Sequence, residues 1–169
     1  EAIRALELDG IGFRNESRRY YPNRELMAPL LGYVGLDNVG LGGLETKFND
    51  LLRGKDGHAL VLTDARHRAF DSVIQPPTAG DSVELTLDTP LQYIVERELA
   101  RGVAEHRAKG GVAIVMDPWT GEVLAMASLP SFNPNAFASS SPDERRNRAV
   151  ADIYEPGSTF KTFTVSGVL

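Results

Sequence analysis

The sequence predicts two units in series, an α+β unit over residues 1–87 and the first part of an α/β unit over residues 88–169. Three segments of the first unit alternate apolar and polar residues with the period of a half-buried strand. In the second unit, a long amphipathic segment precedes two apolar runs separated by a turn, which indicates a helix followed by a hairpin. The 169 residues suffice for one large domain or two small ones with a hydrophobic core.

The first unit is expected to contain two short helices and three strands. Apolar residues at helical spacing predict helices over 24–31 and 41–52, and in the second of these Leu44, Phe48, Leu51 and Leu52 share one stripe. Alternation predicts strands over 58–63, 69–75 and 82–87. The polar residues 64–68 are expected to form a turn between the first two strands.

The second unit is expected to begin with a capped helix over 88–109. Residues 89–92 match a capping box with proline at the first helical position. Strands are predicted over 112–116 and 122–127, joined by a turn over 117–121, with a loop over 129–140 after them. Residues 141–144 match a second capping box. The segment from Phe160 to Leu169 is apolar on every side, which is typical of a core helix, so we expect it to pack against the hairpin or another polypeptide.

Composition excludes several classes of function. A net charge of −5 without a basic stripe argues against a nucleic-acid partner. The absence of cysteine excludes disulfides and thiolate metal sites, and the three histidines (His58, His67 and His106) match no metal-ligand spacing. We therefore expect neither metal nor cofactor. The chain begins at Glu1 in helix-like sequence and ends at Leu169 within an apolar run, so we expect it to be part of a longer protein.

The strongest chemical signal is the pair Ser158 and Lys161. Three residues separate them, so on a helix both side chains project from the same face. A serine hydroxyl becomes a strong nucleophile when a nearby base removes its proton, and a lysine amine serves as that base once desolvation lowers its pKa. Pro156 and Gly157 suit the turn into a helix, whose N-terminus favours negative charge on the serine oxygen.

The same spacing has a structural alternative. Serine and lysine are common, so one such pair is expected by chance in roughly every chain of this length. In that interpretation Ser158 caps a buried helix and Lys161 extends its charge into solvent.

Blocks along both units resemble the middle of a class B penicillin-binding protein, a peptidoglycan D,D-transpeptidase. Residues 19–22 (Arg-Tyr-Tyr-Pro) match the R-x-Y-P signature of that family's pedestal domain. Residues 154–161 (Tyr-Glu-Pro-Gly-Ser-Thr-Phe-Lys) match its S-x-x-K segment in a form that resembles division-type members. Further blocks follow the family's order, at residues 32–35, 43–45, 52–57, 88–92, 117–127, 133–135 and 147–149.

The resemblance implies a pedestal subdomain over 1–87 and the start of a serine β-lactamase-like transpeptidase domain over 88–169. It implies that Ser158 is acylated by a peptidoglycan stem peptide or by a β-lactam, that Lys161 accepts its proton, and that the Ser158 N–H supplies half of an oxyanion hole. It also implies a single-pass anchor in the bacterial cytoplasmic membrane, a catalytic domain on its outer side, and division or elongation membrane proteins as partners.

The family's later S-x-N and K-T-G motifs do not follow Lys161 in this sequence. Residues 131–133 fit S-x-N by letter but precede the nucleophile, and Lys161-Thr162 continues to Phe163. We therefore expect the 169-residue chain alone to be inactive. A β-lactam sensor, a serine β-lactamase relative and a non-catalytic partner-binding pedestal stay open as alternatives.

Charged and aromatic residues elsewhere have simpler interpretations. The polar face of the helix over 88–109, which includes Glu96, is expected to be solvated. Trp119 in the hairpin turn needs no special role. Arg148 has two open interpretations, a solvated side chain or a buried, paired one.

Overall fold

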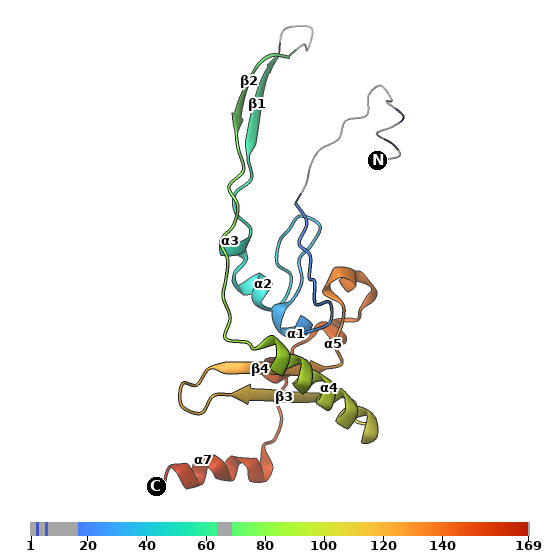
Figure 1. Cartoon of the computed structure of the whole chain (residues 1–169), viewed down its shortest axis with the longest axis vertical. Helices are drawn as coiled ribbons and strands as arrows, with labels where there is room; N and C mark the ends of the chain where they lie inside the picture. The colour runs from blue at the N-terminus through green and yellow to red at the C-terminus, as the bar shows by residue number, and fades with distance from the viewer. Residues whose placement is uncertain (1–2, 4–5, 7–16, 64–68, 169) are drawn as a thin grey trace.

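The computed structural model describes residues 3, 6, 17–63 and 69–168 (Figure 1). A two-stranded ribbon projects from one end of the molecule, a helix-covered hairpin forms the middle, and the C-terminal helix stands apart from both (Figure 1). The predicted turn over 64–68 lies outside the described residues.

Within its described residues, the first unit contains three short α-helices and one antiparallel strand pair. The helices are α1 (Ala28–Leu31), α2 (Gly43–Lys47) and α3 (Asn49–Leu52), and the strands are β1 (His58–Thr63) and β2 (Ala69–Gln75). Both strands have the predicted bounds. The predicted helix over 24–31 is too long, because Arg24 and Met27 adopt positive φ and only the last four residues are helical. The helix predicted over 41–52 is two helices that meet at Phe48.

The strand predicted over 82–87 is wrong. The ribbon's ladder ends with the bridge between Lys55 and Thr78 and a bond from Asp81 N to Leu51 O. Beyond it, the chain runs to the next helix without a strand partner among the described residues. It touches the hairpin through a bond from the Thr86 hydroxyl to Val123 O (2.6 Å) and one from Asp88 N to Leu124 O (2.9 Å).

Close backbone contact explains why the block at residues 32–35 begins with glycine. Gly32 has φ +84° and lies against the Gly42 carbonyl. A Cβ atom on Gly32 would be 1.8 Å from that oxygen, so only glycine fits here. The turn after α1 and the start of α2 are thereby held together.

The second unit is built on α4 (Thr89–Glu105), which covers one face of the hairpin formed by β3 (Gly111–Met116) and β4 (Val123–Leu129). The predicted helix and hairpin are confirmed. The cap differs from the prediction, because Asp88 and not Thr89 is the capping residue, with its Oδ1 accepting from Leu91 N (2.7 Å). Ala125 and Ala127 are fully buried beneath α4, where small side chains let helix and strand approach.

Short helical segments follow the hairpin. The predicted loop over 129–140 contains η2 (Pro134–Ser139), and after it come α5 (Pro142–Arg145) and α6 (Arg148–Ala151). The predicted capping box at the start of α5 is confirmed, since Ser141 and Glu144 each bond the other's backbone N–H.

The chain ends in η3 (Gly157–Phe160) and α7 (Lys161–Ser166). The predicted packing of this segment against the hairpin is wrong, and packing against another polypeptide stays a prediction. Every residue from Ile153 to Val168 is exposed, and 71% of Phe163 is accessible. Phe160 and Phe163 contact each other, with ring centroids 5.6 Å apart, instead of packing on the hairpin. The predicted helix is present, but among residues 17–63 and 69–168 no apolar surface covers it.

Candidate active site

Ser158 lies in η3, one turn before Lys161 begins α7. Gly157 has φ +55°, which lets the chain turn directly after Pro156. The Lys161 N–H donates to the Ser158 carbonyl, so the two residues are joined by one helical turn. The alternative in which Ser158 caps a buried helix is wrong, because the segment is exposed and no side chain caps η3.

The surroundings of this pair are open in the described chain. Across residues 17–63 and 69–168, no hydrogen bond or ion pair involves the Ser158 hydroxyl or the Lys161 ammonium. The neighbouring Thr159 hydroxyl bonds the Pro156 carbonyl and so stabilises the turn. The pair is therefore positioned by local helix geometry alone, and an enclosed pocket must come from other surfaces.

Arg148 is paired in a partly exposed charge cluster upstream of this segment, with its own side chain 18% exposed and that of Asp143 63% exposed. The paired state is that of one of its two interpretations, but the burial is only partial. The Arg148 guanidinium contacts Asp143 (2.5 Å) and Asp152 (3.1 Å), while Arg146 forms a further pair with Asp152. The Arg148 N–H bonds the buried Ser128 hydroxyl (3.1 Å), which ties α6 to β4. A groove of about 760 Å³ lies beside this cluster and is lined by β3 and by Tyr154.

The Arg148 cluster predicts a loss of stability in acid. Hydrogen bonding from Arg146, followed by bonding from Arg148, lowers the pKa of Asp152 below its ordinary value of 3.8. Because the folded pKa lies below the unfolded one, the stabilisation is complete above pH 3.8 and is lost as pH falls through the folded pKa. Urea unfolding should therefore separate wild type from Asp152→Asn at pH 6, and the difference should shrink as pH falls below 3.8. A constant difference across this range would contradict the assignment.

A second set of contacts joins the two units, and it involves the blocks around Tyr21, Glu45 and Asn135. Tyr21 N donates to Asn135 Oδ1 (3.0 Å) and Asn135 Nδ2 donates to Tyr21 O (2.8 Å). The backbone N–H of Asn135 donates to Asn133 Oδ1 (2.9 Å), which fixes the backbone at Asn135. The Asn135 side chain thus bonds both the N–H and the carbonyl of Tyr21, as a neighbouring strand would.

Glu45 is the buried charge of this junction. Its carboxylate accepts from the Tyr21 hydroxyl (3.0 Å) and pairs with Arg19 (3.0 Å), and Glu45 is 8% exposed. Burial and the adjacent carboxylate raise the pKa of the Tyr21 hydroxyl well above its ordinary range. The phenol thus stays protonated and donates, which satisfies the buried carboxylate.

Two further residues connect α4 to the rest of the fold. Glu96 accepts from Met27 N (2.8 Å) and from the Gln92 amide (2.7 Å), so its predicted place on a solvated face is wrong. Gln92 is fully buried and bonds both Met126 N (2.8 Å) and Met126 O (2.9 Å). Sequence analysis missed both roles, although a polar Gln92 beside the apolar stripe was the available signal.

Aromatic packing completes the junction. Tyr33 stacks on Phe137 with centroids 4.6 Å apart and meets Phe132 edge-on at 5.7 Å. The Arg145 guanidinium lies 5.4 Å from the Tyr33 ring centroid. The S-x-N-like residues 131–133 lie in a loop, as predicted, and they also belong to this junction, which the sequence did not predict.

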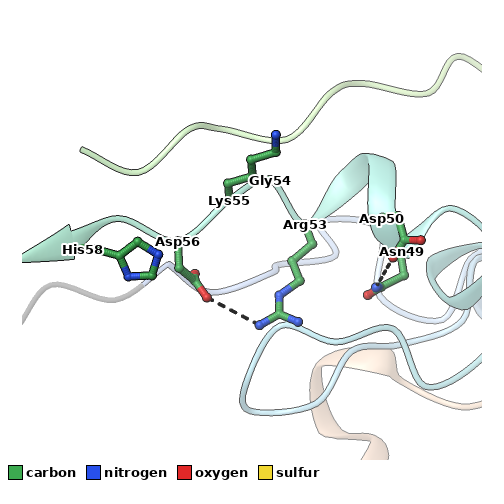
Figure 2. Close-up of a pocket in the computed structure, with 7 residues that line it drawn as sticks. All are labelled: Asn49, Asp50, Arg53, Gly54, Lys55, Asp56 and His58. Atoms are coloured by element: carbon green, nitrogen blue, oxygen red, sulfur yellow. Dashed lines mark hydrogen bonds and ion pairs between the residues drawn. The ribbon is translucent and has the colours of Figure 1, made fainter. Parts of the chain in front are cut away.

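The first unit also has an open depression lined by polar and charged residues (Figure 2). It measures about 530 Å³ and is lined by α3, residues 53–56 and His58. Arg53 and Asp56 face each other across it at 3.5 Å, so its charges are largely balanced.

Among the described residues, no group of histidine, aspartate and glutamate side chains is arranged to bind a metal. No helix in residues 17–63 and 69–168 is both long and apolar enough to span a bilayer.

Two family models match the chain. Residues 2–85 match the penicillin-binding protein dimerisation domain, and residues 111–169 match the penicillin-binding protein transpeptidase domain. The chain is 40% identical over 168 residues to the peptidoglycan D,D-transpeptidase FtsI of Escherichia coli K12, covering 99% of this chain and 29% of that protein. It is 38% identical over 173 residues to the probable peptidoglycan D,D-transpeptidase PenA of Neisseria meningitidis, covering 100% of this chain and 30% of that one.

Solved structures agree with these matches. The crystal structure of penicillin-binding protein 3 from Mycobacterium tuberculosis in complex with aztreonam superposes with a TM-score of 0.73 at 33% identity, covering 89% of this chain and 31% of that one. The chain thus spans about 30% of the length of these relatives, none of which is named as a β-lactamase or a sensor. The predicted fold class is confirmed. The chain belongs to the class B penicillin-binding proteins, with their dimerisation and transpeptidase domains in succession along it.

Proposed function

We propose that this chain forms the pedestal (1–87) and the nucleophile-bearing start of the transpeptidase domain (88–169) of a serine D,D-transpeptidase that cross-links peptidoglycan. The observation that carries the proposal is the helical turn joining Ser158 to Lys161 at the start of α7. It lies in a chain that resembles named D,D-transpeptidases over nearly its whole length.

In the proposed reaction, the Ser158 hydroxyl attacks the carbonyl of the penultimate D-alanine of a stem peptide. Its proton passes to the Lys161 amine, and an oxyanion forms on the attacked carbonyl. The Ser158 N–H, at the start of the helical segment, donates to that oxyanion. The C–N bond to the terminal D-alanine then breaks, the departing amine takes a proton, and an ester on Ser158 remains.

The second half of the reaction releases the ester. An amine of a neighbouring stem peptide attacks the acyl carbon, and the Ser158 oxygen leaves with a proton, so a new peptide cross-link replaces the ester. A β-lactam would follow only the first half, because opening its ring leaves the departing amine attached to the acyl group. The relative from Mycobacterium tuberculosis was crystallised with aztreonam and with ampicillin, which supports β-lactams as ligands.

We also propose the cellular setting of the enzyme. Peptidoglycan cross-linking takes place on the outer side of the cytoplasmic membrane, so the chain is expected there, attached by an anchor and working with membrane proteins of division or elongation. The form of residues 154–158 favours the division type.

The 169-residue chain alone is expected to react with β-lactam too slowly to measure. Ser158 and Lys161 are exposed, and a nucleophile without preorganised donors loses most transition-state stabilisation. Intact mass spectrometry after incubation with benzylpenicillin should show the unmodified mass, beside a whole-enzyme sample that gains one adduct. Stoichiometric acylation of the 169-residue chain would refute this expectation.

A further inference from the structure

Residues 21–27 of the first unit are held against the second unit by side chains that bond their backbone. At one end, Asn135 bonds both the N–H and the carbonyl of Tyr21 (3.0 and 2.8 Å). At the other end, Glu96 Oε1 accepts from the Met27 N–H (2.8 Å). Tyr21 and Met27 are both buried. The segment is thus fixed at its two ends by polar groups of another unit.

The backbone of this segment contains two left-handed residues that are not glycine. Arg24 has φ +50° and Met27 has φ +62°. Residues with a Cβ atom adopt this conformation at a cost in free energy, and they keep it where surrounding contacts impose it. At Met27 the contact is the Glu96 carboxylate, which accepts the N–H of the strained residue itself. The conformation of the segment therefore depends on bonds from the second unit, and it would relax if they opened.

Glu96 also connects the segment to the interior of the second unit. The same carboxylate oxygen accepts from the Gln92 amide (2.7 Å), and the fully buried Gln92 bonds the N–H and the carbonyl of Met126 in β4. Further along β4, the Ser128 hydroxyl accepts from the Arg148 N–H (3.1 Å) at the start of α6, the helix that precedes the nucleophile segment. Contiguous hydrogen bonds and strands of this kind can carry energetic coupling between distant sites.

We propose that residues 21–27 are a latch with two states, closed by Glu96 and Asn135 together, and that the closed latch holds β4 and α6 in the arrangement that acyl transfer needs. Glu96 is then a positioning residue, because it acts on Ser158 only through Gln92 and β4. Opening the latch releases the strained backbone and loosens the attachment of the first unit to the second. The effect on acyl transfer rests on the proposed function, whereas the latch itself does not.

Hydrogen exchange of single amides in the whole enzyme tests whether the segment opens as one unit. Glu96→Ala removes the acceptor of the Met27 N–H. In a two-state latch it should also speed exchange of the Tyr21 N–H about tenfold or more, although that group keeps its own acceptor. Glu96→Gln keeps an oxygen acceptor in the same place, so both rates should stay near those of the wild type. The Asp117 N–H, bonded within the hairpin turn, should not change.

Two results of this experiment would overturn the latch. Faster exchange confined to Met27 would mean that the two ends of the segment open independently. Equal acceleration at Tyr21 and Asp117 would mean that Glu96 stabilises the whole fold and not this segment.

Arg24→Gly tests the strain in the latch. Glycine adopts positive φ without cost, so this variant should favour the closed state and slow exchange of the Tyr21 and Met27 amides several-fold. Asn23→Gly is the matched control, because Asn23 is equally exposed but does not have positive φ, so glycine there adds only flexibility. Exchange that is slowed by Asn23→Gly and not by Arg24→Gly, or hastened by both, would contradict the proposal.

Labelling of the whole enzyme by a fluorescent penicillin tests the coupling to Ser158. Glu96→Ala should slow acylation roughly threefold or more, and Glu96→Gln should restore the wild-type rate. A latch that opens in Glu96→Ala, as seen by exchange, without a change in the labelling rate would overturn the positioning role. Failure of the proposed acyl transfer would instead appear in the wild-type enzyme, as an adduct on a residue other than Ser158, so the two failures are distinguishable.

Discussion

Replacing Ser158 with alanine in the whole enzyme is expected to abolish covalent labelling by a fluorescent penicillin. The substitution removes the only oxygen that the proposed mechanism acylates, so no residual rate is expected from the neighbouring groups. Lys161→Ala should keep the nucleophile but lose its base and slow labelling by about 10²–10⁴-fold. Labelling is read by gel fluorescence over a series of incubation times.

Ser166→Ala is the matched control for this experiment. Ser166 lies in α7 as well, but its hydroxyl donates to Thr162 O (2.8 Å) within the helix, so its loss should leave the labelling rate unchanged. Near-UV circular dichroism of all three variants shows whether the fold is retained. Undiminished labelling of a folded Ser158→Ala variant would mean that another residue is the nucleophile.

Glu45→Ala should be the most destabilising of the single substitutions at the junction, lowering the free energy of unfolding by about 3 kcal/mol. The change leaves the buried Tyr21 hydroxyl without its acceptor and Arg19 without its partner. Since both groups lie where residues 19–22 meet the second unit, the loss weakens the attachment of the pedestal. Urea unfolding at pH 7 measures the difference.

Two comparisons identify the cause of that loss. Glu45→Gln keeps an oxygen acceptor for Tyr21 but removes the ion pair, so it should cost clearly less than Glu45→Ala. Asp50→Ala removes an exposed carboxylate from the neighbouring α3 and should change stability by less than about 0.5 kcal/mol. Equal losses of unfolding free energy for Glu45→Ala and Asp50→Ala would show that the buried contacts of Glu45 do not stabilise the fold more than an exposed carboxylate does.

Elements whose pattern depends on neighbouring residues were predicted well from the sequence. The alternation in 58–63 and 69–75 located β1 and β2, and the spacing of Ser141 and Glu144 located the capped α5. The turn over 117–121 was likewise set by a local group, since Asp117 Oδ1 accepts from Trp119 N (2.7 Å) and Thr120 N (3.0 Å). The bond from Thr120 N lowers the pKa of the Asp117 carboxyl most, and the bond from Trp119 N lowers it further.

Features that depend on distant partners were missed. Alternation alone predicted a strand over 82–87, but a strand also requires a neighbour, and the described chain offers none there. Glu96 was assigned to a solvated face by helical spacing, yet Met27, 69 residues away in sequence, donates to it. The junction around Glu45 and Asn135 was likewise invisible, because nothing in residues 19–22 shows which distant amide will bond them.

The candidate site has one feature that depends on neighbouring residues and one that depends on distant partners. The turn that joins Ser158 to Lys161 is local, so the sequence was sufficient to predict it. The burial predicted for the helix that follows depends on surfaces far away in sequence, and in the described chain that helix is exposed. The same dependence explains why we expect acylation in the whole enzyme and not in this chain alone.

The central claim is that the Ser158 oxygen carries the acyl group, and peptide mapping tests it most directly. The whole enzyme is treated with benzylpenicillin, digested, and analysed by tandem mass spectrometry. The account predicts a single adduct on the peptide that contains residues 154–161, with fragment ions that assign it to Ser158 and not to Thr159 or Thr162. An adduct on any other residue, with the peptide of Ser158 recovered unmodified, would contradict the account.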